Sequence, residues 1–143
     1  MFLARKVKSE SEEKIAGEIL KQYDIEDVVN YNGAKYVLIV DGSLVGVSKV
    51  DFYENIGVLK YLAIDKKAVG DGLGDALIRA ILNYAIMNDI DKVYYPTTDS
   101  YLTKIGFIEK KNCLKIDVEN KEFLLEIELE PFFSAPCKGS KGI

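Results

Sequence analysis

Three closely spaced glycines are the first residues in this chain whose spacing could serve chemistry. Gly70, Gly72 and Gly74 follow the apolar run 58–64 and lead into a segment whose apolar residues recur with helical spacing. Glycine has no Cβ, so the backbone can turn sharply and approach a ligand, and a helix N-terminus offers N–H groups without intrahelical partners. The spacing therefore predicts an anion-binding loop over residues 70–75.

Several interpretations of such a loop can be compared with the neighbouring residues. A dinucleotide fingerprint would need a glycine at position 75, where the chain has Asp75, and a βαβ unit around it. A Walker loop would need a Gly-Lys-Ser/Thr sequence after the glycines, which is missing. Two interpretations stay open: a pyrophosphate cradle for coenzyme A, and a structural turn in which Asp71 or Asp75 stabilises the helix N-terminus.

The composition excludes several kinds of catalytic site. The 143 residues include no histidine and two cysteines, Cys113 and Cys137, outside any CxxC spacing. A Ser-His-Asp triad, a Cys-His nucleophile and a zinc site of Cys and His are therefore excluded, and we expect no metal. Proton transfers would rely on carboxylates, tyrosines, lysines, a thiol or water. Cys113 is expected in the core, and Cys137 as an inert thiol in the tail.

The charge balance bears on partners and location. The chain has 19 basic and 23 acidic residues, a net charge of -4, which argues against a nucleic-acid partner. Apolar runs fall short of the roughly 20 residues that span a bilayer, and residues 1–8 lack the long apolar region of a signal peptide. We therefore expect a cytoplasmic protein that binds neither nucleic acid nor a membrane.

Three segments together carry a family resemblance. Leu62-Ala63-Ile64 comes first, Gly70 to Gly74 opens the helix, and Tyr101 to Phe107 (YLTKIGF) follows later in the chain. This order resembles the GNAT superfamily of acyl-CoA N-acyltransferases, over most of the chain from Phe2 to Glu128. The resemblance implies one α/β (α+β) domain over residues 1–143, in which a mixed, mainly antiparallel sheet splays after the strand 58–64 and is flanked by helices.

The resemblance also implies a cosubstrate and the residues that hold it. Acetyl-CoA would lie in the splay, with an amine as the second substrate, and the protein could form a homodimer. The backbone of Leu62, Ala63 and Ile64 would bind the pantetheine arm and the thioester carbonyl, and the amide of Ile64 could stabilise an oxyanion. The pyrophosphate would be held by the loop residues Val69, Gly70, Asp71, Gly72, Leu73, Gly74 and Asp75.

Three residues depart from the family pattern. Val69 stands where the family usually has a basic or amide side chain, and Asp71 brings a carboxylate toward the phosphates. The tyrosine that often protonates the leaving thiolate falls on Leu102. Tyr101 lies one residue earlier, about 100° away around a helix, and is interpreted either as a packed aromatic or as a catalytic acid.

The sequence also suggests a general base and two candidate functions. Glu54 is the predicted catalytic carboxylate, and Asp51 and Tyr61 are neighbouring candidates on the central strands. The sequence favours an acetyl-CoA-dependent N-acetyltransferase that transfers the acetyl group to a small-molecule amine or a protein amino group by direct attack on the thioester. The alternative is a GNAT-like acyl-CoA-binding or regulatory module without turnover.

The residues before the glycines predict a strand, a helix and an antiparallel meander. The strand covers residues 1–8, and Ser9 with Glu12 forms a capping-box pattern at the start of a helix that ends near Asp24. The expected apolar stripe of this helix is Ile15, Ile19, Leu20 and Tyr23. Hairpin turns at 32–33 (Asn-Gly) and 41–42 (Asp-Gly) connect strands over 28–31, 34–40 and 44–53.

The residues after the glycines complete the expected fold. The helix that follows them ends at Asn88, and a right-handed crossover brings strand 92–95 parallel to strand 58–64. A short helix over 97–104 precedes a hairpin with strands from 106 and over 122–128, turning at 120–121. The aromatic half of the tail from residue 131 is expected to pack, and its last residues to be disordered.

Overall fold

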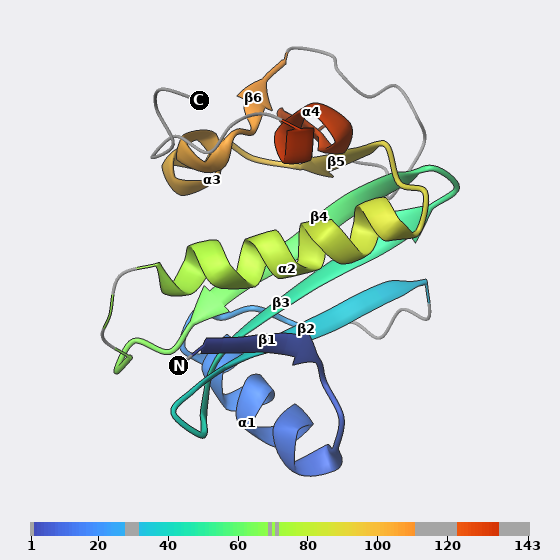
Figure 1. Ribbon diagram of the computed structural model, residues 1–143. Coiled ribbons are helices and arrows are strands. Elements are labelled where there is room, and N and C mark those ends of the chain that lie inside the picture. The colour runs from blue at the N-terminus through green and yellow to red at the C-terminus, as the bar shows by residue number, and fades with distance from the viewer. Residues whose placement is uncertain (1, 28–31, 69, 71, 111–122, 135–143) are drawn as a thin grey trace, which may run out of the picture.

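A mixed sheet forms the centre of the molecule (Figure 1). The computed structural model describes residues 2–27, 32–68, 70, 72–110 and 123–134, and these include seven strands in the order β1-β2-β3-β4-β5-β7-β6. The strands are β1 Phe2–Lys6, β2 Gly33–Val40, β3 Ser43–Tyr53, β4 Ile56–Ile64, β5 Lys92–Tyr95, β6 Ile108–Glu109 and β7 Leu125–Glu128. All neighbours are antiparallel except β4 and β5, which are parallel. The predicted fold class and the parallel crossover are therefore confirmed.

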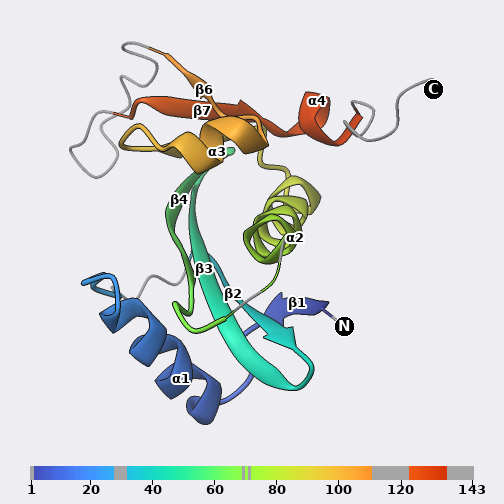
Figure 2. The ribbon, with the colours of Figure 1, turned by 90° about the vertical axis from the view of Figure 1, so that its left-hand side faces the viewer.

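Two long helices cover opposite faces of this sheet (Figure 2). The helices are α1 Glu10–Lys21, α2 Leu73–Met87, α3 Ser100–Ile105 and α4 Leu129–Ser134. Helix α1 packs on β3 and β4, and its side chains share a buried cluster with Val47 and Tyr61. Helix α2 packs on the other face across β1 to β4. The central strands β3 and β4 are thus buried on both faces, as their apolar sequences predict.

The sheet opens between its two parallel strands. Strand β4 pairs with β5 only as far as Val58, which lies opposite Tyr94, whereas β5 continues its ladder with β7 to Tyr95. In the part of the chain that the structure describes, no strand therefore pairs with Leu59 to Ile64 on this edge. The predicted splay is confirmed, and it begins inside β4.

A β-bulge sets which side chains face the opening. Adjacent residues of β3 pair with Leu59 and Tyr61, so Lys60 is an extra residue in β4. One extra residue reverses the in/out alternation of all residues after it. Tyr61 therefore packs in the α1 cluster, whereas Leu62 and Ile64 pack on the α2 side.

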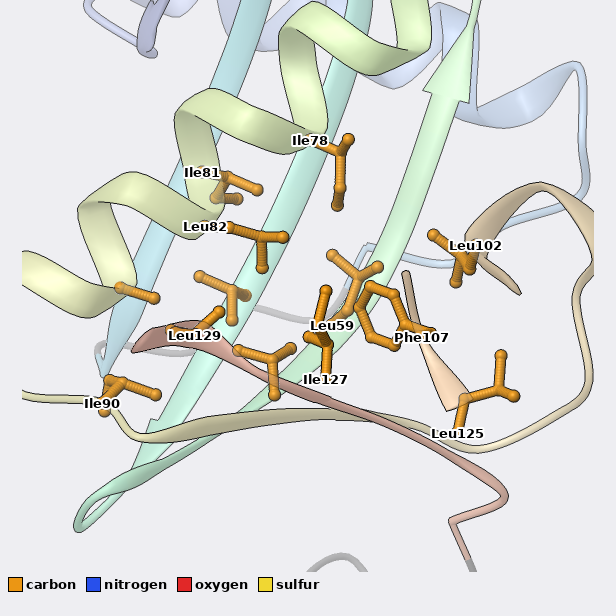
Figure 3. Packing of buried hydrophobic residues seen from close by; sticks show 13 residues of the cluster. Leu59, Ile78, Ile81, Leu82, Ile90, Leu102, Phe107, Leu125, Ile127 and Leu129 are labelled. Atoms are coloured by element: carbon orange, nitrogen blue, oxygen red, sulfur yellow. The ribbon is translucent and has the colours of Figure 1, made fainter. Parts of the chain in front are cut away.

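The largest buried cluster fixes both sides of the opening (Figure 3). Figure 3 shows side chains of α2 meeting those of β4, α3 and β7, with Ile81 and Leu82 facing Leu59, Leu129 and Ile127. Each fully buried side chain of this kind stabilises the fold by about 1.5–3 kcal/mol. The cluster therefore holds β5, β7 and α3 against α2 while β4 diverges from them.

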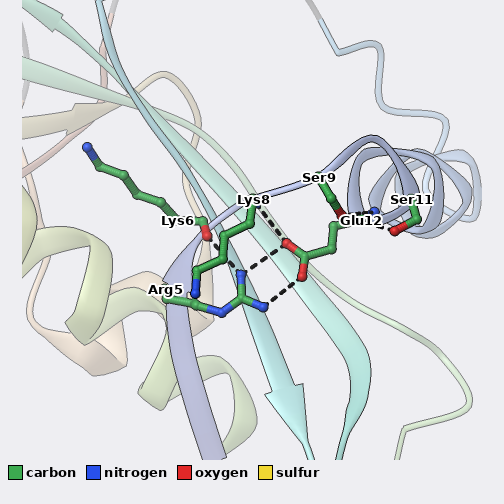
Figure 4. Close-up of polar contacts among 6 residues, drawn as sticks. All are labelled: Arg5, Lys6, Lys8, Ser9, Ser11 and Glu12. Atoms are coloured by element: carbon green, nitrogen blue, oxygen red, sulfur yellow. Dashed lines mark hydrogen bonds and ion pairs between the residues drawn. The ribbon is translucent and has the colours of Figure 1, made fainter.

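Helix α1 is tied to the edge strand β1 by a polar network (Figure 4). Ser9 Oγ accepts a hydrogen bond from the Glu12 N–H at 3.2 Å, which confirms the predicted N-cap. Glu12 does not complete a capping box with Ser9, because its Oε1 accepts from the N–H of Lys8 at 2.8 Å. Its two carboxylate oxygens also accept from Arg5, at 3.0 and 2.7 Å.

The described part of the chain corrects the boundaries and the buried face of α1. The helix ends at Lys21, before the expected Asp24. Ala16 lies in the core, whereas Ile15 and Tyr23 are 40% and 41% exposed, so half of the expected stripe is wrong. The buried strip of α1 is Ala16, Ile19 and Leu20; Ile15 lies beside this strip, and Tyr23 follows the end of the helix.

Corrections also concern the C-terminal part. Strand β6 begins at Ile108 rather than at Gly106, because α3 ends in a left-handed turn at Gly106 and Phe107 enters the core. Residues Leu129–Ser134 form helix α4, which the sequence did not predict. The expected strand 28–31, the turn 120–121, Cys113, Cys137 and the last residues lie outside the described residues.

The described ranges lack two kinds of feature. No helix in them is long and apolar enough to cross a membrane. In the same part of the chain, no three or more His, Cys, Asp or Glu residues are grouped so that they could hold a metal ion.

The Arg5–Glu12 pair predicts how the fold responds to acid. The Arg5 guanidinium and the Lys8 N–H lower the pKa of Glu12 from 4.5 to about 2. The unfolded chain therefore binds a proton here that the folded protein excludes, so this stabilisation is present above about pH 4.5 and is lost as the pH falls toward 2. We expect Glu12→Gln to lower the free energy of unfolding at neutral pH and to flatten its decline between about pH 5 and pH 2.

The measurement is urea denaturation of both proteins across this pH range. Glu10→Gln is the matched control, because Glu10 is an exposed carboxylate in the same first turn. Equal pH dependence of the wild type and Glu12→Gln would contradict the prediction.

Candidate functional site

A large cleft lies where β4 and β5 diverge. Its volume is about 1380 Å³, above the roughly 300–1,000 Å³ of ordinary small-molecule pockets. Its walls come from the second half of β4, the loop and first turns of α2, the end of β5, α3 and α4. The described residues that were expected to bind the cosubstrate and that line this cleft are Leu62, Ile64, Gly70, Gly72, Leu73, Gly74 and Asp75. The cleft is therefore long enough for an extended ligand that contacts both β4 and the glycine loop.

The other expected binding residues are placed differently. Ala63 pairs with Val47 of β3 and packs in the α1 cluster, so it does not line the cleft. Val69 and Asp71 lie outside the described residues.

The backbone of β4 presents hydrogen-bonding groups to the cleft. The N–H of Asp65 donates to the carbonyl of Val45 at 2.7 Å, so the next pair, Gly46 with Ile64, is a non-hydrogen-bonded pair of the antiparallel ladder. The N–H and C=O groups of Ile64 consequently point away from β3, toward the edge that β5 leaves open. The same alternation applies two residues earlier, to Leu62. Leu62 and Ile64 thus offer backbone donors in the cleft, as the sequence predicted.

The C-terminal end of α1 fixes this end of β4. The hydroxyl of Tyr23 donates a hydrogen bond to the carbonyl of Ile64. Gln22 donates to Asp65 Oδ1 at 3.1 Å and accepts from the N–H of Lys66 at 2.9 Å. Sequence analysis missed these roles of Gln22 and Tyr23, because nothing in the spacing shows that α1 ends beside residues 64–66.

The N-terminus of α2 offers the second set of donors. Gly72, the N-cap residue, has φ 80° and no side chain with which to cap the helix. The carboxylate of Asp75 does not cap the helix either, since it accepts two hydrogen bonds from Arg79 Nε, at 3.0 and 3.2 Å. Among the described residues no side chain caps the first N–H groups of α2, which can therefore meet an anion in the cleft. Asp75 lies in the first turn of the helix, and Asp71 lies outside the described residues, so the structural turn stays an alternative.

Tyr101 and Leu102 point in different directions from α3. Both residues line the cleft, but Tyr101 is 37% exposed, whereas Leu102 is 2% exposed and belongs to the main hydrophobic cluster. The Tyr101 hydroxyl lies against the first turn of α2: a Cβ added to Gly74 would be 2.8 Å from its oxygen. Burial and the neighbouring Asp75 raise the pKa of Tyr101, against the opposing effect of Arg79. The side chain therefore reaches the cleft as a protonated hydroxyl.

The predicted general bases lie elsewhere. Glu54 is in the turn between β3 and β4, at the opposite end of β4 from Ile64, and lines a separate hollow with Phe52 and Tyr84. The carboxylate of Asp51 is buried with Lys49 Nζ 3.8 Å away. The structure does not bring these carboxylates to the cleft, because the β3–β4 hairpin directs them away from it.

Tyr61 is also outside the cleft. The bulge at Lys60 turns its side chain toward α1, where its hydroxyl donates to Asp27 at 2.9 Å. Burial and this carboxylate raise its pKa far above the ordinary value, so it stays a neutral phenol.

Sequence reasoning also missed titratable residues that line the cleft, among them Tyr95. Tyr95 is the last residue of β5, lines the cleft and is half-buried. Burial, followed by the charge of Asp99, raises its pKa, and a hydrogen bond with Thr97 opposes the shift. Its position beyond the last β4–β5 pair could not be inferred without knowing where the two strands separate.

Solved structures share this architecture. The ribosomal-protein-S18-alanine N-acetyltransferase from Escherichia coli superposes with a TM-score of 0.69 at 11% identity, covering 90% of this chain and 94% of its own. The PaiA N-acetyltransferase from Thermoplasma acidophilum, in complex with coenzyme A, gives 0.65 at 15% identity, covering 90% and 99%. At these identities the likeness shows the fold.

A third neighbour is longer than this chain. N-acetylglutamate synthase from Neisseria gonorrhoeae, complexed with coenzyme A and N-acetyl-glutamate, gives a TM-score of 0.69 at 19% identity over 90% of this chain. The chain covers 35% of that structure's length. A comparison with the curated proteins found no match.

The comparison with protein families agrees with the fold and with the resemblance drawn from the sequence. The model of the acetyltransferase (GNAT) family matches residues 4–112, from the first strand to the segment after β6. This match covers well over half of the 143 residues. The chain therefore belongs to the GNAT acetyltransferase family.

Proposed function

We propose that this protein is an N-acetyltransferase that transfers the acetyl group of acetyl-CoA to an amine. The observation that carries the proposal is the open edge of β4, which turns backbone donors of Leu62 and Ile64 into the same cleft as the uncapped N-terminus of α2. A thioester carbonyl and pantetheine amides need donors of the first kind, and a pyrophosphate needs donors of the second kind. The two sets lie along one extended cleft.

The chain's own groups account for binding and for charge stabilisation. Acetyl-CoA would supply the acetyl group as a thioester. The N–H groups of Leu62 and Ile64 would donate to the thioester carbonyl and to the pantetheine arm, and the first N–H groups of α2 would hold the pyrophosphate. These backbone groups are fixed before the ligand arrives, so little reorganisation opposes the stabilisation of an oxyanion.

The transfer itself needs no covalent intermediate on the protein. The unprotonated amine would attack the carbonyl carbon, the new C–N bond would form as the C–S bond breaks, and the amine proton would pass to water. The sulfur would leave as a thiolate that takes a proton from solvent. This direct route suits a cleft that no predicted carboxylate base reaches, and it relies mainly on alignment of the two substrates.

The acceptor is either a small-molecule amine or a protein amino group. Structural neighbours support both kinds of acceptor. One neighbour is a ribosomal-protein-S18-alanine N-acetyltransferase, and another was solved with N-acetyl-glutamate. The homodimer, the cytoplasmic location and the lack of nucleic-acid or membrane partners stay predictions.

One observation favours a second candidate function, an acyl-CoA-binding or regulatory module without turnover. Leu102 stands where the family pattern has its tyrosine, and it is buried among apolar side chains where it can give no proton. Tight acyl-CoA binding without transfer to any amine would support this alternative.

The proposed function is tested by direct assay. We expect the purified protein to bind acetyl-CoA and to release CoA thiol in the presence of some member of a broad panel of amines. The measurements are calorimetric titration with acetyl-CoA and detection of free thiol, with the acetylated amine identified by mass spectrometry. A protein that binds no acyl-CoA at millimolar concentration would falsify the proposal.

Gly72→Glu tests the anion site. A glutamate there puts a carboxylate at the start of α2, so we expect acetyl-CoA binding and thiol release to be abolished by like charge. The matched control is Gly42→Glu: Gly42 has φ 86°, close to that of Gly72, has open space around it and lies in the β2–β3 turn. Both variants carry similar backbone strain, about 1–3 kcal/mol, so equal binding by the two would contradict the assignment.

A further inference from the structure

Tyr101 is the polar side chain that reaches from α3 to the first turn of α2. The nearest atoms to a Cβ added at Gly74 are the Tyr101 hydroxyl oxygen at 2.8 Å and its Cζ at 3.0 Å. Real Cβ atoms essentially never approach a neighbour as closely as 2.8 Å, so the phenol can occupy this position only because residue 74 is glycine. The hydroxyl thus lies beside the same N–H groups that form the anion site.

The thioester end of the cleft is occupied by a different residue of α3. Leu102 belongs to the same buried cluster as Leu59, the first residue of β4 beyond its pairing with β5. Successive residues of a helix are about 100° apart, so Leu102 facing this cluster directs Tyr101 toward α2. Tyr101 shares the cleft with Leu62, and its hydroxyl lies against the first turn of α2.

The charged groups around the hydroxyl are the carboxylates of Asp75 and Asp99 and the guanidinium of Arg79. Asp75 is bound by Arg79, and the Arg79 guanidinium also lies 5.0 Å from the centroid of the Phe132 ring. This pairing compensates the carboxylate next to the anion site. Because burial and Asp75 raise the pKa of Tyr101, the phenol is a donor rather than a phenolate at neutral pH.

We propose that Tyr101 binds a phosphate group of the cosubstrate with its hydroxyl and is not the acid that protonates the leaving sulfur. The inference rests on the proposed function. It makes Tyr101 a determinant of cosubstrate choice: full-length acyl-CoA gains a hydrogen bond that a thioester of pantetheine alone cannot form. Gly74 contributes to the same phosphate contact, because any larger residue at this position would displace the Tyr101 side chain.

The test compares binding of CoA with binding of pantetheine, which has the same arm and no pyrophosphate. We expect Tyr101→Phe to weaken CoA binding about tenfold or more, the loss of one hydrogen bond to a charged group, and to leave pantetheine binding unchanged. With acetyl-CoA the variant should raise KM and leave kcat unchanged. Tyr84→Phe is the control, since it removes a phenol hydroxyl on α2 that lies outside the cleft.

Gly74→Ala is the second variant. It keeps the backbone N–H and improves helix propensity, but its Cβ would push the phenol away. We expect it to weaken CoA binding in the wild type and to have no effect in a Tyr101→Ala background, where the ring is missing. Additive effects of the two substitutions on CoA binding would contradict the inference.

The outcomes separate this inference from the proposed function. A wild type that binds no CoA overturns both. A wild type that binds CoA, together with a Tyr101→Phe protein of equal affinity, overturns the inference alone. A fall in kcat with both acetyl-CoA and acetyl-pantetheine, at unchanged CoA affinity, would assign Tyr101 to proton transfer and likewise overturn it.

Discussion

The parallel pairing of β4 and β5 ends at Val58 and Tyr94, and the rest of the site depends on this interruption. A strand in the middle of a sheet normally has both edges satisfied, since unpaired backbone groups away from water are costly. Here the second half of β4 keeps its ladder with β3, and no strand of the described residues pairs with its other edge. The separation is held by the apolar cluster that binds β5, β7 and α3 to α2. The opening is therefore a packed feature of the fold and not a local loss of order.

Two supports turn this opening into a site with defined donors. The bulge at Lys60 directs Leu62 and Ile64 to the α2 side, and the end of α1 holds the residues that follow through Gln22 and Tyr23. The glycine loop places the N-terminus of α2 at the same cleft. No side chain of the described residues caps the first N–H groups of this helix. The donors come from the backbone, so their positions follow from the strand register and the helix start. A chain without histidine can form such a site, because these donors are backbone groups.

The sequence predicted the features that depend on local chemistry. The Asp41-Gly42 turn has φ angles of 50° and 86°, as a tight hairpin turn requires, and the glycine loop opens α2. Sequence reasoning failed where long-range packing decides. The side of α1 that is buried, the distance of Glu54 from the cleft and the bulge at Lys60 follow from how elements meet, which no spacing records. The direction of the Tyr101 side chain could not be predicted either, because the sequence pattern places Tyr101 on α3 but does not show how that helix is rotated.

The open edge of β4 is also a place where one more strand could pair with the sheet. Edges of this kind usually invite pairing with another polypeptide, and folded proteins cover or interrupt them. In this fold residues of α3, α4 and the glycine loop line the same cleft as this edge. A thin chain that carries amide groups can still pair there as an extended peptide pairs with a sheet edge. Under the proposed function, the cosubstrate arm would act as a substitute strand, and ligand binding would complete the sheet.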